Sequence, residues 1–290
     1  MKRDFRVSIP LAILAVLIFF LLVVGGLVRN LGAGLSCPDW PLCQGRLIPE
    51  FDLKVFAEYF HRLFAATVSL LTLVLSVIIF SNKKLKSHLG KPMGWALAFL
   101  FSQVILGGLT VLKLLQSEIV TLHLVTGTTF FLIVIYMALK ARRSNIPSAT
   151  IEKKNLFRLG VLTLTAIYLQ IILGGMVSSH YAGLACPDFP RCLGEWWPLM
   201  AGNVPYQIFH RLGAGVVFII TLVFAFKVSN LFPGKAVLVL LALLTQVGLG
   251  ISNVIFRLPV PLSVAHLAVA QALIALVLMA DYEIRYFKLH

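Results

Sequence analysis

Residues 58–62 have the sequence Glu-Tyr-Phe-His-Arg, and a close copy, Gln-Ile-Phe-His-Arg, returns at residues 207–211. Each copy opens a long apolar run, where an ionisable or metal-binding side chain is costly unless it has a function. Each half of the chain has a second histidine further along, in Thr-Leu-His at 121–123 and in Val-Ala-His at 264–266. The chain is therefore expected to be organised around two matched pairs of histidines.

The duplication extends beyond the histidines. Residues 33–41 match residues 182–190 at the same offset of 149, and His123 matches His266 at an offset of 143. Because this offset spans four apolar runs, it keeps the direction of the chain through a membrane. The two halves are therefore expected to be parallel repeats related by an axis along the membrane normal.

The composition is that of a membrane protein, with 59% apolar and 12% charged residues. Eight apolar runs are long enough to cross a bilayer. They lie at residues 9–28, 56–80, 93–112, 119–139, 157–177, 205–228, 235–256 and 262–281. The predicted fold is an all-α integral membrane protein with eight transmembrane helices, arranged as two parallel-repeat four-helix bundles that cover residues 1–143 and 144–290.

The positive charge is a signal of orientation. A net charge of +14 is compatible with nucleic-acid binding, but 17 of the 25 Lys and Arg residues lie at the two termini and in alternate connections. The opposite connections hold six. The positive-inside rule then places both termini in the cytoplasm. We expect a multi-pass protein of the cell membrane whose partner is the lipid bilayer and not nucleic acid.

The four cysteines are expected to form two local disulfides. Cys37 and Cys43 share the first outward connection, and Cys186 and Cys192 share the third. Pairs that face an oxidising compartment form disulfides. Pinning a short loop and a redox function both stay open as roles, whereas zinc is disfavoured because neither pair has a histidine at ligand spacing.

The four histidines are expected to bind haem. All four lie early in helices that run inward from the outer face, so they share one depth. Two histidines on facing helices can supply both axial ligands of a haem iron. The pairs are predicted to be His61 with His123 and His210 with His266. The alternative is that each is an interfacial side chain hydrogen-bonded to its neighbours, and zinc is less suitable because each half offers only two histidines.

A carboxylate distinguishes the two halves. Glu58 lies three residues before His61, on the same helix face, where it can accept a proton or stabilise positive charge on a substrate carbon. Gln207 replaces it in the second half, so the N-terminal site is predicted to be catalytic and the C-terminal site to transfer electrons. Alternatively, Glu58 is a solvated carboxylate. Arg62 and Arg211 are candidates for haem-propionate contacts or for snorkelling to the interface.

A glutamine precedes a glycine by four residues in three of the apolar runs. The pairs are Gln103 with Gly107, Gln170 with Gly174, and Gln246 with Gly250. Small residues let membrane helices approach closely, so helix packing explains the glycines. A flat ring lying against each glycine is the alternative.

These residues resemble the haem A synthases, membrane enzymes of bacteria and mitochondria. The resemblance covers nearly the whole chain and rests on Gly-Leu-Ser-Cys-Pro-Asp-Trp-Pro-Leu-Cys at 34–43, on Glu58 to Arg62, and on the later cysteines and histidines. It implies oxidation of the C8 methyl of haem O to a formyl group by successive hydroxylations, which gives haem A for cytochrome oxidase.

The same resemblance implies a role for each site residue. His61 and His123 correspond to the ligands of the substrate haem, and His210 and His266 to the ligands of a bound haem b cofactor. Glu58 corresponds to the catalytic carboxylate. The pairs Cys37–Cys43 and Cys186–Cys192 correspond to a disulfide in each of two outer loops.

Two other functions compete with this enzyme. A bis-histidine dihaem electron carrier would hold both haems without changing them, and a haem transporter or assembly factor would bind haem reversibly. The exchange of Glu58 for Gln207 argues against both, because a symmetric carrier needs no single charged site. The implied partners are haem O, an unidentified electron donor, haem O synthase and cytochrome oxidase assembly factors. The sequence leaves the oligomeric state open, a homo-oligomer included.

Overall fold

The computed structural model describes residues 5–50, 52–142 and 151–286, and its regular elements there are all helical. The predicted all-α membrane fold is confirmed, because eight of these helices are long and apolar enough to cross a membrane. They are α1 (Phe5–Asn30), α2 (Leu53–Ser81), α3 (Lys83–Leu112), α4 (Ser117–Arg142), α5 (Ile151–Ser179), α6 (Val204–Ser229), α7 (Pro233–Ile255) and α8 (Val260–Tyr286), with a short 3₁₀ turn η1 (Ala182–Leu184).

Several helices are longer than the apolar runs that predict them. Capping residues outside those runs set the boundaries of α2 and α3. Asp52 precedes α2 and accepts hydrogen bonds from the backbone N–H groups of the first turn at 2.8 Å. Asn82 ends α2 and caps α3 in the same way, so α3 begins at Lys83, ten residues before its apolar run. Hydropathy alone misses that polar first part of α3, whereas capping chemistry locates it.

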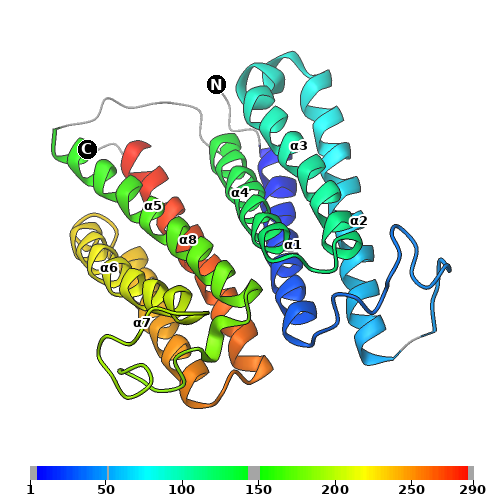
Figure 1. Ribbon diagram of the computed structural model, residues 1–290. Helices are drawn as coiled ribbons and strands as arrows, with labels where there is room; N and C mark the ends of the chain where they lie inside the picture. Colours follow the sequence, from blue (N-terminus) through cyan, green and yellow to red (C-terminus); the bar gives the residue numbers. More distant parts are fainter. Residues whose placement is uncertain (1–4, 51, 143–150, 287–290) are drawn as a thin grey trace. The chain divides into compact units, whose positions relative to one another are not determined.

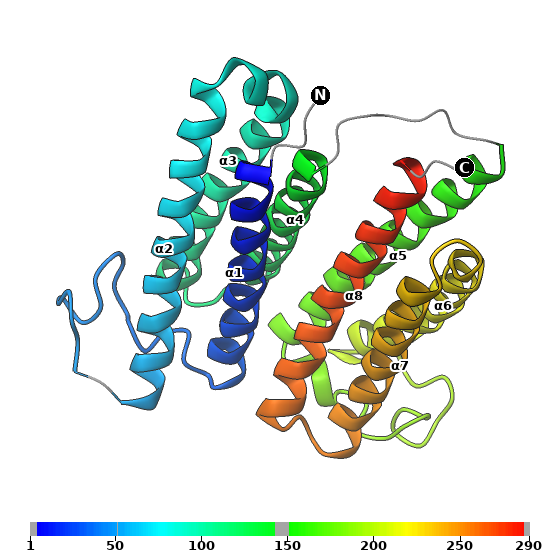
Figure 2. The ribbon, with the colours of Figure 1, turned by 180° about the vertical axis from the view of Figure 1, so that it is seen from behind.

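The chain divides into two compact units, with the border between residues 145 and 146. In the first unit α1 and α3 each pack against both α2 and α4, which closes a ring of four helices (Figure 1). In the second unit α5 and α7 each pack against both α6 and α8 (Figure 2). The predicted domain border at 143/144 lies outside the described residues, and the symmetry axis between the halves stays a prediction.

A disulfide closes the long loop between the first two helices of each unit. Cys37 and Cys43 form one bond, Cys186 and Cys192 the other, as predicted. Inside the first loop, the Asp39 carboxylate accepts backbone hydrogen bonds from Gln44 and Gly45. The Gly45 bond is the largest influence that holds the pKa of Asp39 below its ordinary value. The carboxylate therefore stays charged and keeps this turn closed until the pH falls through that lowered pKa.

The short turn after α3 packs against this loop. Leu114 and Leu115 both adopt left-handed backbone conformations, with φ of 51° and 59°. Such conformations cost roughly 1–2 kcal/mol per residue and need support from packing. Leu115 has that support, because its side chain fills the space where a Cβ on Gly34 would lie, 3.2 Å from Cδ2. Leu258 lies against Gly183 in the same way in the second unit.

Candidate functional site

The four predicted histidines lie near the starts of α2, α4, α6 and α8. They follow the first helical residue by eight positions in α2 and by six in the others. In each unit these two helices lie diagonally across the ring, because each of them packs against the other two helices of its unit. The structure therefore brings the members of each pair together inside one bundle. We call His61 with His123 the first site and His210 with His266 the second site.

The second site has the geometry of two axial ligands. The ring centroids of His210 and His266 lie 6.5 Å apart, with 77° between the ring planes. With metal–nitrogen bonds of about 2 Å and roughly 1 Å more to each ring centre, two axial imidazoles on one iron have centroids about 6 Å apart. The observed spacing therefore fits a bis-histidine haem ligand pair.

The chemistry of the donor set supports the same group. Nδ1 of His61, of His123 and of His266 is buried without a hydrogen-bond partner, an arrangement that needs an explanation in a folded protein. Within the part of the chain that the structure describes, no three His, Cys, Asp or Glu side chains form a cluster that could hold a metal ion. A two-ligand haem iron fits these residues, whereas a zinc site built from three or four side chains does not.

A glycine of the neighbouring helix makes room for each imidazole. A Cβ on Gly174 of α5 would lie 3.1 Å from Cε1 of His210, and one on Gly250 of α7 would lie 3.1 Å from Cε1 of His266. Gly25 and Gly107 have the same relation to His61 and His123, at 3.1 and 3.5 Å. The flat ring that lies against each of these glycines is thus the imidazole of a candidate histidine.

Replacing Gly174 by alanine is expected to disturb the second site. The new methyl would meet the His210 ring at a distance shorter than van der Waals contact, so the ring must shift by a few tenths of an ångström. Overpacking of this kind costs about 1–3 kcal/mol. Absorption spectroscopy of the purified protein should show a weakened bis-histidine haem spectrum. Gly215→Ala in α6, the helix that holds His210, is the control, because a Cβ there has no neighbour within 4 Å. Equal spectra in both variants would contradict the packing role.

Glu58 is buried with both oxygens occupied. Only 4% of the residue is exposed. Oε1 accepts a hydrogen bond from the Arg62 guanidinium at 2.6 Å, and Oε2 accepts one from the backbone N–H of Cys37 at 2.8 Å. The interpretation of Glu58 as a solvated carboxylate is therefore wrong. Its contacts tie the start of α2, and with it the first site, to the disulfide loop.

Gln207 occupies the corresponding place in the second unit and makes different contacts. Its amide Nε2 donates to the carbonyl of Gly183 at 3.1 Å, while its Oε1 is buried without a partner. Arg211 forms no ion pair with it and donates instead to the carbonyls of Cys186, Asp188 and Arg191. The charge difference predicted between the two halves is thus also a difference in how each loop is held.

Arg62 donates to loop carbonyls like its counterpart. Its guanidinium binds the carbonyl oxygens of Cys37, Asp39 and Leu42 at 2.7 Å, in addition to Glu58. Arg62 and Arg211 therefore each bind the backbone of one disulfide loop and hold that loop against its helix bundle. Contact with a haem propionate, predicted from the sequence, stays a prediction.

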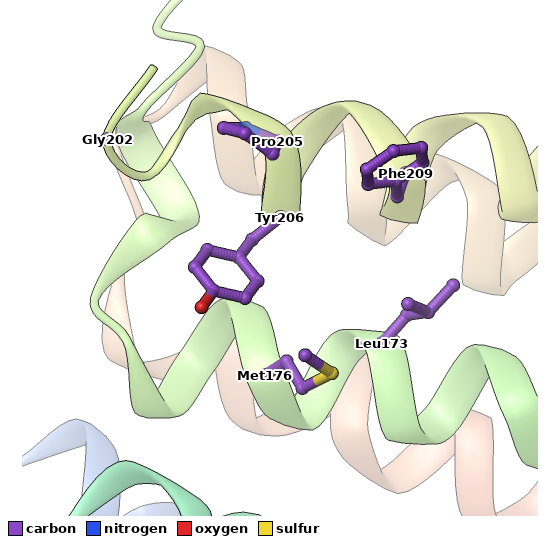
Figure 3. Close-up of a pocket in the computed structure, with 6 residues that line it drawn as sticks. All are labelled: Leu173, Met176, Gly202, Pro205, Tyr206 and Phe209. Carbon is purple, nitrogen blue, oxygen red and sulfur yellow. The ribbon is translucent and has the colours of Figure 1, made fainter. Parts of the chain in front are cut away.

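A pocket of about 360 Å³ lies between α5 and α6 near the second site (Figure 3). Six residues line it: Leu173, Met176, Gly202, Pro205, Tyr206 and Phe209. None of the predicted ligands is among them, although Phe209 directly precedes His210. The lining is mostly apolar, so the pocket adds no chemical group to the site.

Sequence reasoning missed how the glutamines contact the histidines. The amide Nε2 of Gln170 on α5 lies 3.0 Å from Nδ1 of His210 and donates to the His210 carbonyl at 2.8 Å. The amide Nε2 of Gln246 on α7 lies 3.3 Å from Nε2 of His266. The sequence shows the four-residue spacing between each glutamine and its glycine. This spacing puts both residues on one helix face, so Gln170 and Gly174 meet the ring of His210, and Gln246 and Gly250 meet the ring of His266.

The chain is similar to known proteins over nearly its full length. Residues 9–278 match the model of the COX15-CtaA family, described as a cytochrome oxidase assembly protein. The heme A synthase of Shewanella oneidensis is 31% identical, with 94% of each chain covered. That of Halalkalibacterium halodurans is 30% identical over 81% of this chain and 82% of its own. That of Neorickettsia sennetsu is 24% identical over 92% and 95%. The chain therefore belongs to the COX15-CtaA family of cytochrome oxidase assembly proteins.

Proposed function

We propose that this protein is a haem A synthase, which oxidises the C8 methyl of haem O to the formyl group of haem A. The observation that carries the proposal is the asymmetry between two otherwise matched histidine pairs. Both pairs lie on diagonal helices of a four-helix ring. Only the first has a buried carboxylate one helical turn before its histidine, at Glu58.

Each pair has its own role in this proposal. His61 and His123 bind haem O, the substrate, and His210 and His266 bind haem b, a cofactor. A bound haem iron supplies oxygen activation or electron transfer, chemistry that no side chain provides. Each imidazole pair would hold one haem inside its bundle. The 6.5 Å spacing of the second pair supports a bis-histidine haem in that site.

Glu58 provides the charge that the second site lacks. Its carboxylate is kept from water by burial and held in one orientation by Arg62 and the Cys37 amide. A fixed negative charge in a water-poor site stabilises positive charge that develops on a substrate carbon, and it can accept a proton. Because Cys37 belongs to the first disulfide, the loop contributes directly to the position of this carboxylate.

The membrane placement follows from the charge distribution. With 17 of the 25 basic residues at the termini and in alternate connections, the termini lie in the cytoplasm and the disulfide loops outside, in the cell membrane. The loop that contacts Glu58 and its counterpart in the second unit would then face the oxidising side, where their disulfides persist. Electrons for the reaction come from a separate donor, and haem O arrives from haem O synthase.

The direct test is conversion by the purified protein. Supplied with haem O, a reductant and oxygen, the protein should yield a formyl-bearing haem that extraction and chromatography identify. Unchanged haem O, bound with a bis-histidine spectrum, would favour the dihaem electron carrier instead. Release of unchanged haem O to an acceptor protein would favour a carrier or assembly factor.

A further inference from the structure

The imidazoles of the two sites differ in whether a side-chain amide contacts them. In the second site Gln170 lies 3.0 Å from a ring nitrogen of His210, and Gln246 lies 3.3 Å from a ring nitrogen of His266. Nδ1 of His266 is buried without a hydrogen-bond partner, and so are Nδ1 of His61 and Nδ1 of His123 in the first site, where the amide of Gln103 is directed to the backbone. The unit that lacks the carboxylate thus has amides at both of its imidazoles, and the unit that has the carboxylate does not.

The contact of Gln170 depends on two positions that differ between the repeats. At the offset of 149, Leu21 stands where Gln170 is, and Phe64 stands where Gly213 is. Gly213 matters because a Cβ there would lie 2.3 Å from Oε1 of Gln170. The second unit therefore combines an amide with the space that admits it, whereas the first has two large apolar side chains at these places.

The contact of Gln246 depends on a third position. Gln103 is its counterpart at the offset of 143, but its amide donates to the carbonyl of His123 at 2.9 Å and to the hydroxyl of Thr126. Val269 replaces Thr126 in the second unit and offers no hydroxyl. The same residue type is therefore directed to the backbone in one site and to the imidazole in the other.

We propose that Gln170 and Gln246 are positioning residues that fix the two imidazoles of the second site, and that the first site exchanges its haem because its imidazoles lack such contacts. This inference rests on the proposed function, in which the second site retains a cofactor while the first takes up a substrate and releases a product. A ligating histidine usually has a partner at its other ring nitrogen, which fixes the ring and strengthens the ligand. Nε2 of Gln170 holds His210 at both its backbone carbonyl and its ring nitrogen. Oε1 of Gln246 is buried without a partner, and a half-turn of that amide presents it to the ring N–H of His266.

The retained haem gives the direct test. In full-length protein carrying His61→Ala, the bound haem belongs to the second site, and its transfer to apomyoglobin can be followed by absorption. Adding Gln170→Leu, the residue found at position 21, should speed transfer by about 10- to 100-fold, the usual effect of losing such a partner. Gln103→Leu is the matched control, because its amide contacts the backbone and Thr126, and transfer should be unchanged.

A conservative variant separates the contact from packing. Gln170→Glu keeps a hydrogen-bonding group of the same length at this place, so transfer should stay closer to the parent rate than in Gln170→Leu protein. Equal transfer in the Gln170→Leu protein and its parent would overturn the inference. So would equally fast transfer in the Gln170→Glu and Gln170→Leu proteins.

The reverse exchange tests the first site. In protein carrying His210→Ala, the double change Leu21→Gln with Phe64→Gly should slow haem transfer from His61 and His123, and an unchanged rate would count against the inference. The outcomes also separate the inference from the proposed function. Wild-type protein without any bis-histidine haem would overturn both, whereas a normal haem spectrum with a Gln170→Leu transfer rate like the parent's would overturn the inference alone.

Discussion

Glu58→Gln protein is expected to bind both haems and to lose the conversion of haem O. Removing a group that transfers a proton in the rate-determining step costs about 10²- to 10⁴-fold in rate. The fold should survive, because Gln207 occupies the matching position and the glutamine oxygen can still accept the Cys37 N–H bond. The rate of formyl-haem formation in the purified variant, measured beside its haem content, checks this expectation.

The control for that variant is Gln207→Glu, which places a carboxylate in the second site. It should leave the conversion of haem O in place, because the first site keeps its own carboxylate. Wild-type rates in Glu58→Gln protein would remove Glu58 from the chemistry. Its ion pair with Arg62 and its bond to Cys37 would then be purely structural.

His210→Ala protein is expected to lose the tightly held haem b and keep the substrate haem. An iron with one axial imidazole loses the bis-histidine spectrum and binds less strongly, so about one of two haems per chain should disappear. His61→Ala should do the reverse, with haem b retained and haem O conversion lost. Haem extraction with absorption spectra of the two purified variants measures both effects. An unchanged bis-histidine spectrum in His210→Ala protein would contradict the assignment of the second site.

The positions of the histidines could be predicted from the sequence because they follow from the spacing of the apolar runs and from the internal duplication of the chain. Four histidines near the starts of alternate apolar runs share one depth, and duplication pairs them. The structure adds the spacing of His210 and His266, which follows from how α6 and α8 face each other. Hydropathy also places the eight helices, although it misses the start of α3, where lysines precede the apolar run.

The environment of Glu58 could not be predicted, because it depends on the path of a loop. Cys37 lies 21 residues before Glu58, and no pattern in that interval indicates that its backbone N–H meets the carboxylate. The contacts of Gln103 and Gln246 show a second reason. The two residues match in type and repeat position, yet Thr126 draws one amide away from its histidine. Only packing between helices makes that distinction visible.

Haem analysis of the wild-type protein tests the central claim most directly. Protein is purified from cells that make haem O and from cells that do not, and its haems are extracted and separated by chromatography. We expect haem b in both preparations, and haem O with its oxidised, formyl-bearing products only in the first. Haem b alone in both, unchanged under oxygen and reductant, would contradict the division of the chain into a catalytic site and a retained-haem site.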